Sequence, residues 1–233
     1  ISDLRDESDR EGMRVVIGYN RSAEKAKALA ASLPGEGHAA LTAPVTDSAA
    51  LGAMAAEIAK RYGVCDVLVN CAGVTRFVPH GDLDSLDDAL IENILSTNVR
   101  GPFATVRALR PLLDKSKLPG GAVIINISSI AAVTAMGSNV IYCASKAAVD
   151  NMTKSLGRAL APRIRVVSIS PGVVDNDFIR SMDKQWLDEQ VARTPLKRLA
   201  APDEVAASVI AAIKQLTFTT GAIIPVDGGR PLS

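Results

Sequence analysis

Hydrophobic and polar positions along the chain alternate between two kinds of segment. Short runs rich in Val, Ile and Ala indicate strands buried on both faces, and longer stretches with apolar residues three or four apart indicate amphipathic helices. The predicted strands are Arg14–Tyr19, Ala39–Ala43, Val67–Asn70, Ala122–Ile127, Arg165–Ser170 and Ala222–Val226. The predicted helices are Ala23–Ser32, Ser48–Tyr62, Leu86–Leu113 with a break near Thr97–Asn98, Val140–Leu160 and Asp203–Gln215.

This alternation of strands and helices predicts an α/β fold. Strands separated by a helix pair in parallel through right-handed crossovers, which builds a doubly wound sheet between two layers of helices, a three-layer αβα arrangement. Ligands bind such sheets outside the carboxyl ends of the strands. The chain has 233 residues, a length that single α/β units commonly reach, so we expect residues 1–233 to form a single domain.

Composition and charge narrow the class of protein. The formal net charge of +1 gives no reason to expect a nucleic acid or an anionic membrane as a partner. No apolar run approaches the roughly eighteen residues of a membrane-spanning helix, and the start of the chain is too acidic for a signal peptide. We therefore expect a cytoplasmic protein.

The cysteines and histidines give no indication of a metal. Cys65, Cys71 and Cys143 are odd in number and lack metal-ligand spacing, and His38 and His80 are isolated. We therefore expect neither a disulfide framework nor a metal site.

The segment from Tyr142 to Lys146 carries the most informative chemistry, near the start of a predicted helix. Residues four apart share one helical face, so the phenol and the ammonium face one ligand. A free tyrosine has a pKa of about 10, and acid–base catalysis near neutral pH requires stabilisation of its phenolate. Lys146 is expected to lower the pKa of Tyr142. The alternative is a packing tyrosine beside a solvated lysine.

Two further polar residues are expected at the same edge of the sheet. Ser129 follows the predicted strand Ala122–Ile127, and Asn98 lies at the break in a predicted helix. We expect Ser129 to hydrogen-bond the substrate oxygen where charge develops, and Asn98 to hold a water behind Lys146 as a proton path. The predicted catalytic residues are Asn98, Ser129, Tyr142 and Lys146.

Together with the segments Asn70-Cys71-Ala72-Gly73 and Pro171-Gly172, these four residues make the chain resemble the short-chain dehydrogenase/reductase family from about Met13 to Gly229. The likeness is to its 3-oxoacyl-thioester reductase-like members. The resemblance implies a Rossmann-type fold, a nicotinamide cofactor, and Tyr142 as the proton donor or acceptor, with Lys146 assisting. It does not identify the substrate.

The resemblance also implies which residues bind the cofactor. Asn70, Ala72 and Gly73 would lie near the adenosine ribose, and backbone groups after the strand Arg165–Ser170 would bind the nicotinamide carboxamide. The expected cofactor-binding residues are Asn20, Arg21, Ser22, Asn70, Ala72, Gly73, Tyr142, Lys146, Pro171, Gly172 and Val173.

At three positions the chain departs from the pattern of the family. Cys71 replaces a second asparagine, which we expect to be tolerated. Pro44 stands where an aspartate usually meets the adenine, so Asp47 or backbone groups would have to substitute. Asn176 stands near the position of the usual threonine and is expected to replace its hydrogen bond.

The opening strand and glycine-rich turn of a dinucleotide-binding domain are not evident before Arg14. Gly12 is the only glycine there, and Leu4–Glu11 resembles part of the helix between the first and second strands of the family. Without the opening strand, neighbouring strands would be unpaired at a buried edge. We therefore expect an N-terminal segment that this sequence does not represent, rather than a true truncation.

The end of the first predicted strand favours NADP(H) over NAD(H). Gly18-Tyr19-Asn20-Arg21-Ser22 contains no carboxylate to bind a ribose 2′-hydroxyl, whereas a guanidinium and a hydroxyl suit a 2′-phosphate. The alternative is that Arg21 is a solvated charge and Ser22 only caps the helix that begins at Ala23.

Residues 174–202 form too long a connection to be a simple loop and are predicted to be a substrate lid. Apolar residues recur there at helical spacing, which equally suits a surface helix packed on the core. The expected substrate contacts are Ile130, Phe178, Met182 and Trp186. Their apolar character favours a modest-sized ketone or acyl substrate, although Arg180, Lys184 and Arg193 would suit an acidic carrier.

The leading function is therefore an NADP(H)-dependent oxidoreductase that interconverts a carbonyl and a secondary alcohol by hydride transfer, with Tyr142 as acid or base. Reduction of a 3-oxoacyl thioester and oxidation of a polyol or sugar are the alternatives within this class. A non-catalytic dinucleotide-sensing module and a methyltransferase are alternatives of other classes. The expected partner is a small-molecule substrate. The resemblance implies a homo-oligomer, a dimer or tetramer, paired through the helices Asn98–Leu113 and Val140–Leu160.

Overall fold

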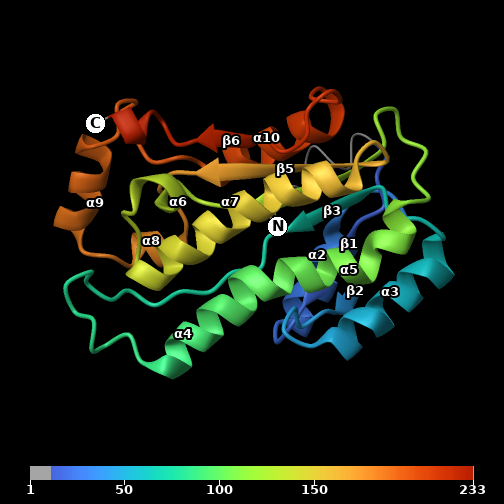
Figure 1. The fold of residues 1–233 in the computed structure, drawn as a ribbon, viewed down its shortest axis with the longest axis horizontal. Coiled ribbons are helices and arrows are strands. Elements are labelled where there is room, and N and C mark those ends of the chain that lie inside the picture. The colour runs from blue at the N-terminus through green and yellow to red at the C-terminus, as the bar shows by residue number, and fades with distance from the viewer. Residues whose placement is uncertain (1–11, 233) are drawn as a thin grey trace.

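The computed structural model describes residues 12–232 and places parallel strands between layers of helices (Figure 1). The strands are β1 (Val16–Tyr19), β2 (Ala39–Thr42), β3 (Val67–Asn70), β4 (Ala122–Ile127), β5 (Ile164–Pro171) and β6 (Ile223–Val226). The order β3-β4-β5-β6 forms a four-stranded sheet, and β1 pairs with β2. All six strands that the pattern predicted are confirmed.

The predicted helices are confirmed, and the structure adds helical segments at Ala131–Thr134, Asp177–Arg180, Lys184–Ala192 and Arg230–Leu232. The helices are α2 (Ala23–Ser32), α3 (Ser48–Tyr62), α4 (Asp88–Leu95), the π-helical turn η2 (Ser96–Arg100), α5 (Gly101–Leu113), α6 (Ala131–Thr134), α7 (Val140–Leu160), α8 (Asp177–Arg180), α9 (Lys184–Ala192), α10 (Pro202–Lys214) and the 3₁₀ turn η3 (Arg230–Leu232). The break expected near Thr97–Asn98 is the π-helical turn η2, a form that often marks functional sites.

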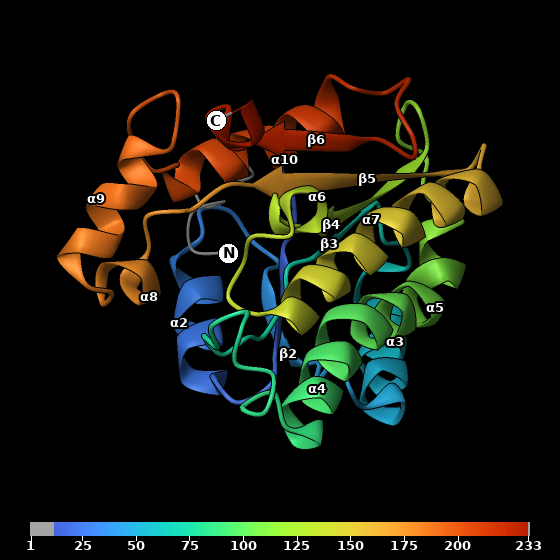
Figure 2. The same cartoon turned by 60° about the vertical axis from the view of Figure 1, so that its left-hand side comes forward.

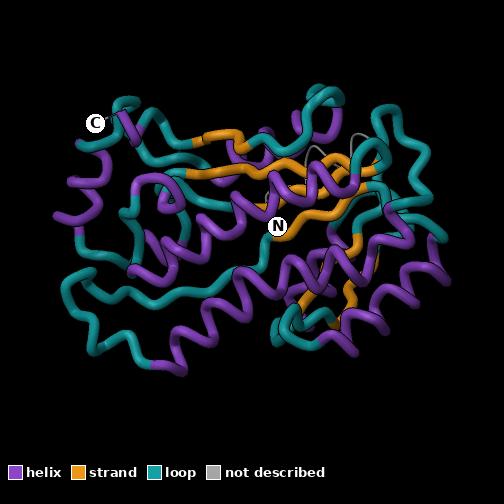
Figure 3. The backbone as a smooth tube through the Cα atoms, viewed as in Figure 1, coloured by secondary structure: helices purple, strands orange, loops and turns teal. Residues whose placement is uncertain are grey.

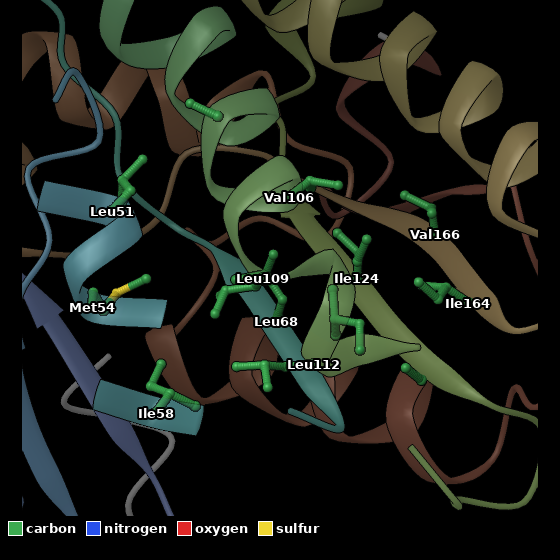
Figure 4. Close-up of a cluster of buried hydrophobic side chains, with 13 residues drawn as sticks. Leu51, Met54, Ile58, Leu68, Val106, Leu109, Leu112, Ile124, Ile164 and Val166 are labelled. Carbon is green, nitrogen blue, oxygen red and sulfur yellow. The ribbon is translucent and has the colours of Figure 1, made fainter. Parts of the chain in front are cut away.

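Buried side chains hold a layer of helices on each face of the four-stranded sheet. On one face, α3 and α5 pack on β3, β4 and β5 through residues such as Leu51, Leu109 and Ile124 (Figure 4). On the other face, α10 packs through Val209 against Val123 and its neighbours. The Val and Ile runs of β4 and β5 are therefore apolar at consecutive positions because both of their faces are covered.

The single continuous sheet that the pattern predicts is divided in two. Among residues 12–232 no hydrogen-bonded ladder joins β1 to β3. Val16 and Leu41 pack against the cluster that α3 forms with β3, so side chains rather than a strand ladder join the two sheets. The helix expected at Leu4–Glu11 lies outside the described residues.

The carboxyl ends of the longest strands point to one end of the molecule, where α6, α8 and α9 lie (Figures 1 and 2). The tube in Figure 3 shows that loops form much of this end. The fold therefore gathers the segments that follow β4 and β5 at the edge where a ligand is expected. No helix within residues 12–232 has the length and apolar character needed to cross a membrane.

Two glycine substitutions test the close packing of α7 against the turn before β6. A Cβ on Gly157 would lie 2.8 Å from the backbone nitrogen of Gly221, whereas a Cβ on Gly52 of α3 would meet open space. We predict that Gly52→Ala stabilises the protein by about 0.5–1 kcal/mol. Gly157→Ala should destabilise it by about 1–3 kcal/mol because the backbone must move apart. Urea denaturation measures both changes, and equal stabilities of the two variants would contradict the packing.

Candidate active site

Asn139 determines how α7 begins and therefore where Tyr142 lies. The Asn139 side chain is fully buried, and its Oδ1 accepts a hydrogen bond of 2.7 Å from the backbone nitrogen of Tyr142. Its Nδ2 donates to the backbone oxygen of Arg76, also at 2.7 Å. One side chain thus caps α7 and ties its first turn to the long loop after β3.

Tyr142 and Ser129 meet at the carboxyl edge of the sheet, as predicted. Burial raises the pKa of Tyr142, and a hydrogen bond with Ser129 opposes the shift without cancelling it. The Ser129 hydroxyl also accepts a hydrogen bond of 3.2 Å from the backbone nitrogen of Ala131, which fixes it at the start of α6. The phenol is consequently protonated near neutral pH.

Lys146 is buried, which contradicts the alternative of a solvated lysine. Its side chain is 7% exposed, and Nζ donates a hydrogen bond of 2.8 Å to the backbone oxygen of Ile127. Nζ lies 5.6 Å from the centroid of the Tyr142 ring. Burial lowers the pKa of Lys146, while Cys71 and Asp150 raise it. Burial of the phenol raises the pKa of Tyr142, and the expected opposing effect of Lys146 on that pKa stays a prediction.

Asn98 connects three parts of the site. It is 1% exposed in η2, and its Oδ1 accepts a hydrogen bond of 2.8 Å from the backbone nitrogen of Val74. Its Nδ2 donates to the backbone oxygen of Val74 at 3.0 Å and to Ser145 Oγ at 3.1 Å. Asn98 therefore fixes the loop after β3 against α7. Its expected role toward a water behind Lys146 stays a prediction.

The side chain of Asn70 points into the protein rather than toward a ligand. Its Nδ2 donates a hydrogen bond of 2.9 Å to Asn126 Oδ1, and Asn126 Nδ2 donates over 2.9 Å to Thr153 Oγ1. This buried chain of hydrogen bonds links β3, β4 and α7. The next residues, Cys71, Ala72 and Gly73, are exposed. A Cβ on Gly73 would lie 3.8 Å from Lys146 Nζ, so these small residues form the open edge beside the lysine.

The segment after β5 meets the same edge. The backbone oxygen of Pro171 accepts a hydrogen bond of 3.0 Å from the nitrogen of Ile130, and Gly172 donates over 3.0 Å to the oxygen of Val226. A Cβ on Gly172 would lie 3.0 Å from the Cα of Asp227, so this close approach favours glycine. The Ile130 side chain is only 7% exposed, which leaves little of it for the expected substrate contact.

The residues expected at a 2′-phosphate follow β1. Asn20, Arg21 and Ser22 are all exposed. Ser22 is the N-cap residue of α2, but its side chain makes no capping hydrogen bond, so the capping alternative is not observed. The only acidic residue in the first turn of α2, Glu24, pairs with Lys27 at 3.1 Å.

Residues 174–202 contain the short helix α8 and the longer helix α9. Val174 pairs with Ala200 in a parallel bridge, so the two ends of this segment lie side by side. Met182 and Trp186 are half-buried, and the side chain of Phe178 lies outside what the structure describes.

The cations of the expected lid have local partners. Arg180 makes two hydrogen bonds to Asp175, at 2.8 and 3.1 Å, and Lys184 pairs with Asp188 at 3.1 Å. Arg193 Nη2 approaches the sulfur of Met136 at 3.7 Å, which connects the end of α9 to the loop before α7. Two of the three cations that would suit an acidic carrier are thus paired with carboxylates.

Asn139 and Asn126 are site residues that the sequence reasoning missed. Asn139 stands three residues before Tyr142, the spacing typical of an N-cap, and Asn126 interrupts the apolar run of β4. Both signals were therefore present in the pattern. Within residues 12–232, no group of three or more His, Cys, Asp and Glu side chains is arranged to hold a metal ion.

The chain belongs to the short-chain dehydrogenase/reductase family. A family model described as enoyl-(acyl carrier protein) reductase matches residues 6–230. The chain is 30% identical over 223 residues to 3-oxoacyl-(acyl-carrier-protein) reductase FabG of Staphylococcus aureus, covering 94% of this chain and 88% of that one. It is 36% identical over 219 residues to D-threitol dehydrogenase of Mycolicibacterium smegmatis, covering 92% and 82%.

Solved structures agree with this family. The crystal structure of a gluconate 5-dehydrogenase from Burkholderia cenocepacia in complex with NADP and tartrate has a TM-score of 0.88 and 27% identity, covering 99% of this chain and 90% of that one. The fold is therefore of the Rossmann type. The protein is an oxidoreductase that acts on carbonyl or alcohol groups with a nicotinamide cofactor.

The environments of the three cysteines generate a labelling prediction. Cys71 is exposed and Cys143 is buried, and burial raises the pKa of Cys65 to about 11. Iodoacetamide near neutral pH should therefore modify Cys71 first. If Cys71–Gly73 borders the cofactor, NADPH or NADH should slow this reaction. Mass spectrometry measures the rate, with Cys71→Ser as the control, and equal rates with and without cofactor would contradict the placement.

Proposed function

We propose that the protein is an NADP(H)-dependent oxidoreductase that interconverts a carbonyl and a secondary alcohol, with Tyr142 as the acid–base residue. The convergence of Tyr142, Ser129 and Lys146 at one edge of the sheet carries this proposal. Ser129 hydrogen-bonds the phenol, and the buried Lys146 ammonium lies 5.6 Å from the centroid of the tyrosine ring. These residue types supply a proton donor, a hydrogen-bond donor for the substrate oxygen and a stabilising charge.

The residues present fit a nicotinamide cofactor. Ala72 and Gly73 are small and exposed, so the edge of the sheet beside Lys146 is open to a ligand. After β5, Gly172 allows the backbone to pass close to Asp227. Asn20, Arg21 and Ser22 would hold the 2′-phosphate, and Pro171–Val173 would meet the nicotinamide end. The bound cofactor supplies or accepts the hydride.

The protein residues perform the proton transfer. In the reducing direction, Tyr142 donates its proton to the carbonyl oxygen as that oxygen gains negative charge, while the Ser129 hydroxyl hydrogen-bonds the same oxygen. The phenol holds its proton near neutral pH and burial raises its pKa further, so the transfer requires stabilisation of the phenolate. The Lys146 ammonium then stabilises the phenolate. In the oxidising direction the proton passes from the alcohol to Tyr142.

NADP(H) is favoured over NAD(H) because the end of β1 presents exposed Arg21 and Ser22 and no carboxylate. A guanidinium forms charge-assisted hydrogen bonds to a phosphate, whereas a ribose 2′-hydroxyl is normally bound by an acidic residue. The presence of NADP in the gluconate 5-dehydrogenase structure is consistent with this preference.

A free small carbonyl or alcohol is the proposed substrate class, and a carrier-bound 3-oxoacyl group is the second candidate. The likeness to FabG favours the second candidate. The pairing of Arg180 and Lys184 with carboxylates of their own segment favours the first, because paired cations attract an acidic carrier less. Residues 174–202 would serve as the lid over this substrate.

A homo-oligomer in the cytoplasm is also proposed, through the helices α5 and α7. Phe103 of α5 is 46% exposed and Val140 of α7 is 39% exposed, so both helices offer apolar surface to a second copy.

Tyr142→Phe should reduce turnover by at least about a hundredfold, the scale of general acid–base catalysis, and should leave cofactor binding intact. The phenyl ring preserves the packing but cannot transfer the proton. Activity at 340 nm and cofactor dissociation constants measure the two effects. Tyr62→Phe is the matched control, because it removes a hydroxyl of α3 that donates a hydrogen bond to the backbone oxygen of Gly37. Near-normal turnover of Tyr142→Phe would refute the assignment.

Arg21→Ala should weaken NADPH binding about tenfold to a hundredfold, the scale of a charge-assisted hydrogen bond, and leave NADH binding nearly unchanged. Dissociation constants for both cofactors at fixed salt test this, because phosphate contacts are screened. Lys25→Ala, which removes an exposed charge from the first turn of α2 close to Arg21 in the sequence, controls for a general electrostatic effect. An equal loss for both cofactors would remove Arg21 as the discriminating residue.

A further inference from the structure

We propose that Arg230 and Gln190 are positioning residues that hold the lid helix α9 against the turn after β6. This inference rests on the proposed function insofar as residues 174–202 cover the substrate. According to this proposal, one buried polar contact between α9 and the C-terminal turn holds the lid in place.

The contact between the two side chains is direct. Arg230 Nη1 donates a hydrogen bond of 2.8 Å to the backbone oxygen of Gln190, and Nη2 donates over 2.9 Å to Gln190 Oε1. Arg230 is 6% exposed and Gln190 is 8% exposed. Thr194 Oγ1 donates to the same backbone oxygen at 2.8 Å. The guanidinium therefore binds both the side chain and the backbone of one residue of α9.

This contact is made at the most buried position of α9. Gln190 is the one buried residue among the nine residues of this helix, all of which the structure describes. Trp186 and Leu187 are only half-buried. A helix held mainly by apolar burial has little directional restraint, whereas a forked hydrogen bond restrains both position and rotation. Removing the acceptor would leave a buried guanidinium without that partner, which is costly.

The turn that carries Arg230 also touches the cofactor side of the site. Gly172 donates a hydrogen bond to the oxygen of Val226, and a Cβ on Gly172 would lie 3.0 Å from the Cα of Asp227. A Cβ on Gly228 would lie 2.7 Å from Thr194 Cγ2, just beyond α9. The turn is thus packed between the segment expected at the nicotinamide and the lid helix. A shift of this turn would therefore move both the lid helix and the segment Pro171–Val173.

The single tryptophan of the chain, Trp186, lies on α9 and reports on this helix directly. We expect Gln190→Leu to increase acrylamide quenching of Trp186 and to lower its fluorescence anisotropy. Gln190→Glu keeps an acceptor for Arg230 and should restore the wild-type values. Gln185→Leu makes the same change on the exposed face of α9 and should have no effect. This readout does not depend on turnover, so it decides the proposal even if the proposed activity fails.

Kinetics provide the second readout, with ethyl acetoacetate as the probe substrate and NADPH as the reductant. Gln190→Leu should raise the KM for the probe about tenfold, which corresponds to about 1.4 kcal/mol. The turnover number should change less, and the dissociation constant of NADPH should not change. Arg230→Met should reproduce the effect, and the double variant should add little to either single variant because both remove one contact.

Circular dichroism establishes that each variant is folded. If Gln190→Leu does not fold, the comparison of Arg230→Lys with Gln190→Glu at the same temperature replaces it, since lysine cannot form the forked contact. Wild-type quenching in a folded Gln190→Leu or Arg230→Lys variant would overturn the proposal. So would an equal change in Gln185→Leu. Absence of turnover in the wild-type protein, with the quenching pattern as expected, would refute the proposed function alone.

Discussion

The arrangement of the site depends on one buried amide, that of Asn98. Its hydrogen bonds to the backbone of Val74 and to Ser145 join the π-helical turn, the loop after β3 and the first turns of α7. A buried amide is stable only when its polar atoms are bonded, so these three segments have one mutual arrangement. The loop bearing Gly73 and the helix bearing Lys146 are held beside one another as a result.

Burial shifts the acid–base equilibria of Tyr142 and Lys146. Desolvation opposes charge, so it raises the pKa of the Tyr142 phenol and lowers that of the Lys146 ammonium. The proposed proton transfer from Tyr142 therefore requires Lys146 to stabilise the resulting phenolate.

Polar contacts also connect the parts of the molecule that are least covered by apolar packing. The long loop after β3 is tied to α7 by Asn139, and α9 is tied to the C-terminal turn by Arg230. In both cases a side chain from one segment binds the backbone of another. Such contacts restrain direction as well as distance, which an apolar surface does not. The segments around the ligand edge therefore have defined positions although much of their surface is exposed.

Local periodicity and helix geometry predict the six strands, the longer helices α2, α3, α5, α7 and α10, the break at Thr97–Asn98 and the spacing of Tyr142 and Lys146. Contacts between residues distant in the chain turn Asn70 inward to Asn126, bury Lys146 and raise the pKa of Tyr142. They also leave β1 and β2 in a separate sheet and bond Arg230 to Gln190 of α9. These properties depend on which residues distant in the chain come together, and local patterns contain no information about such contacts.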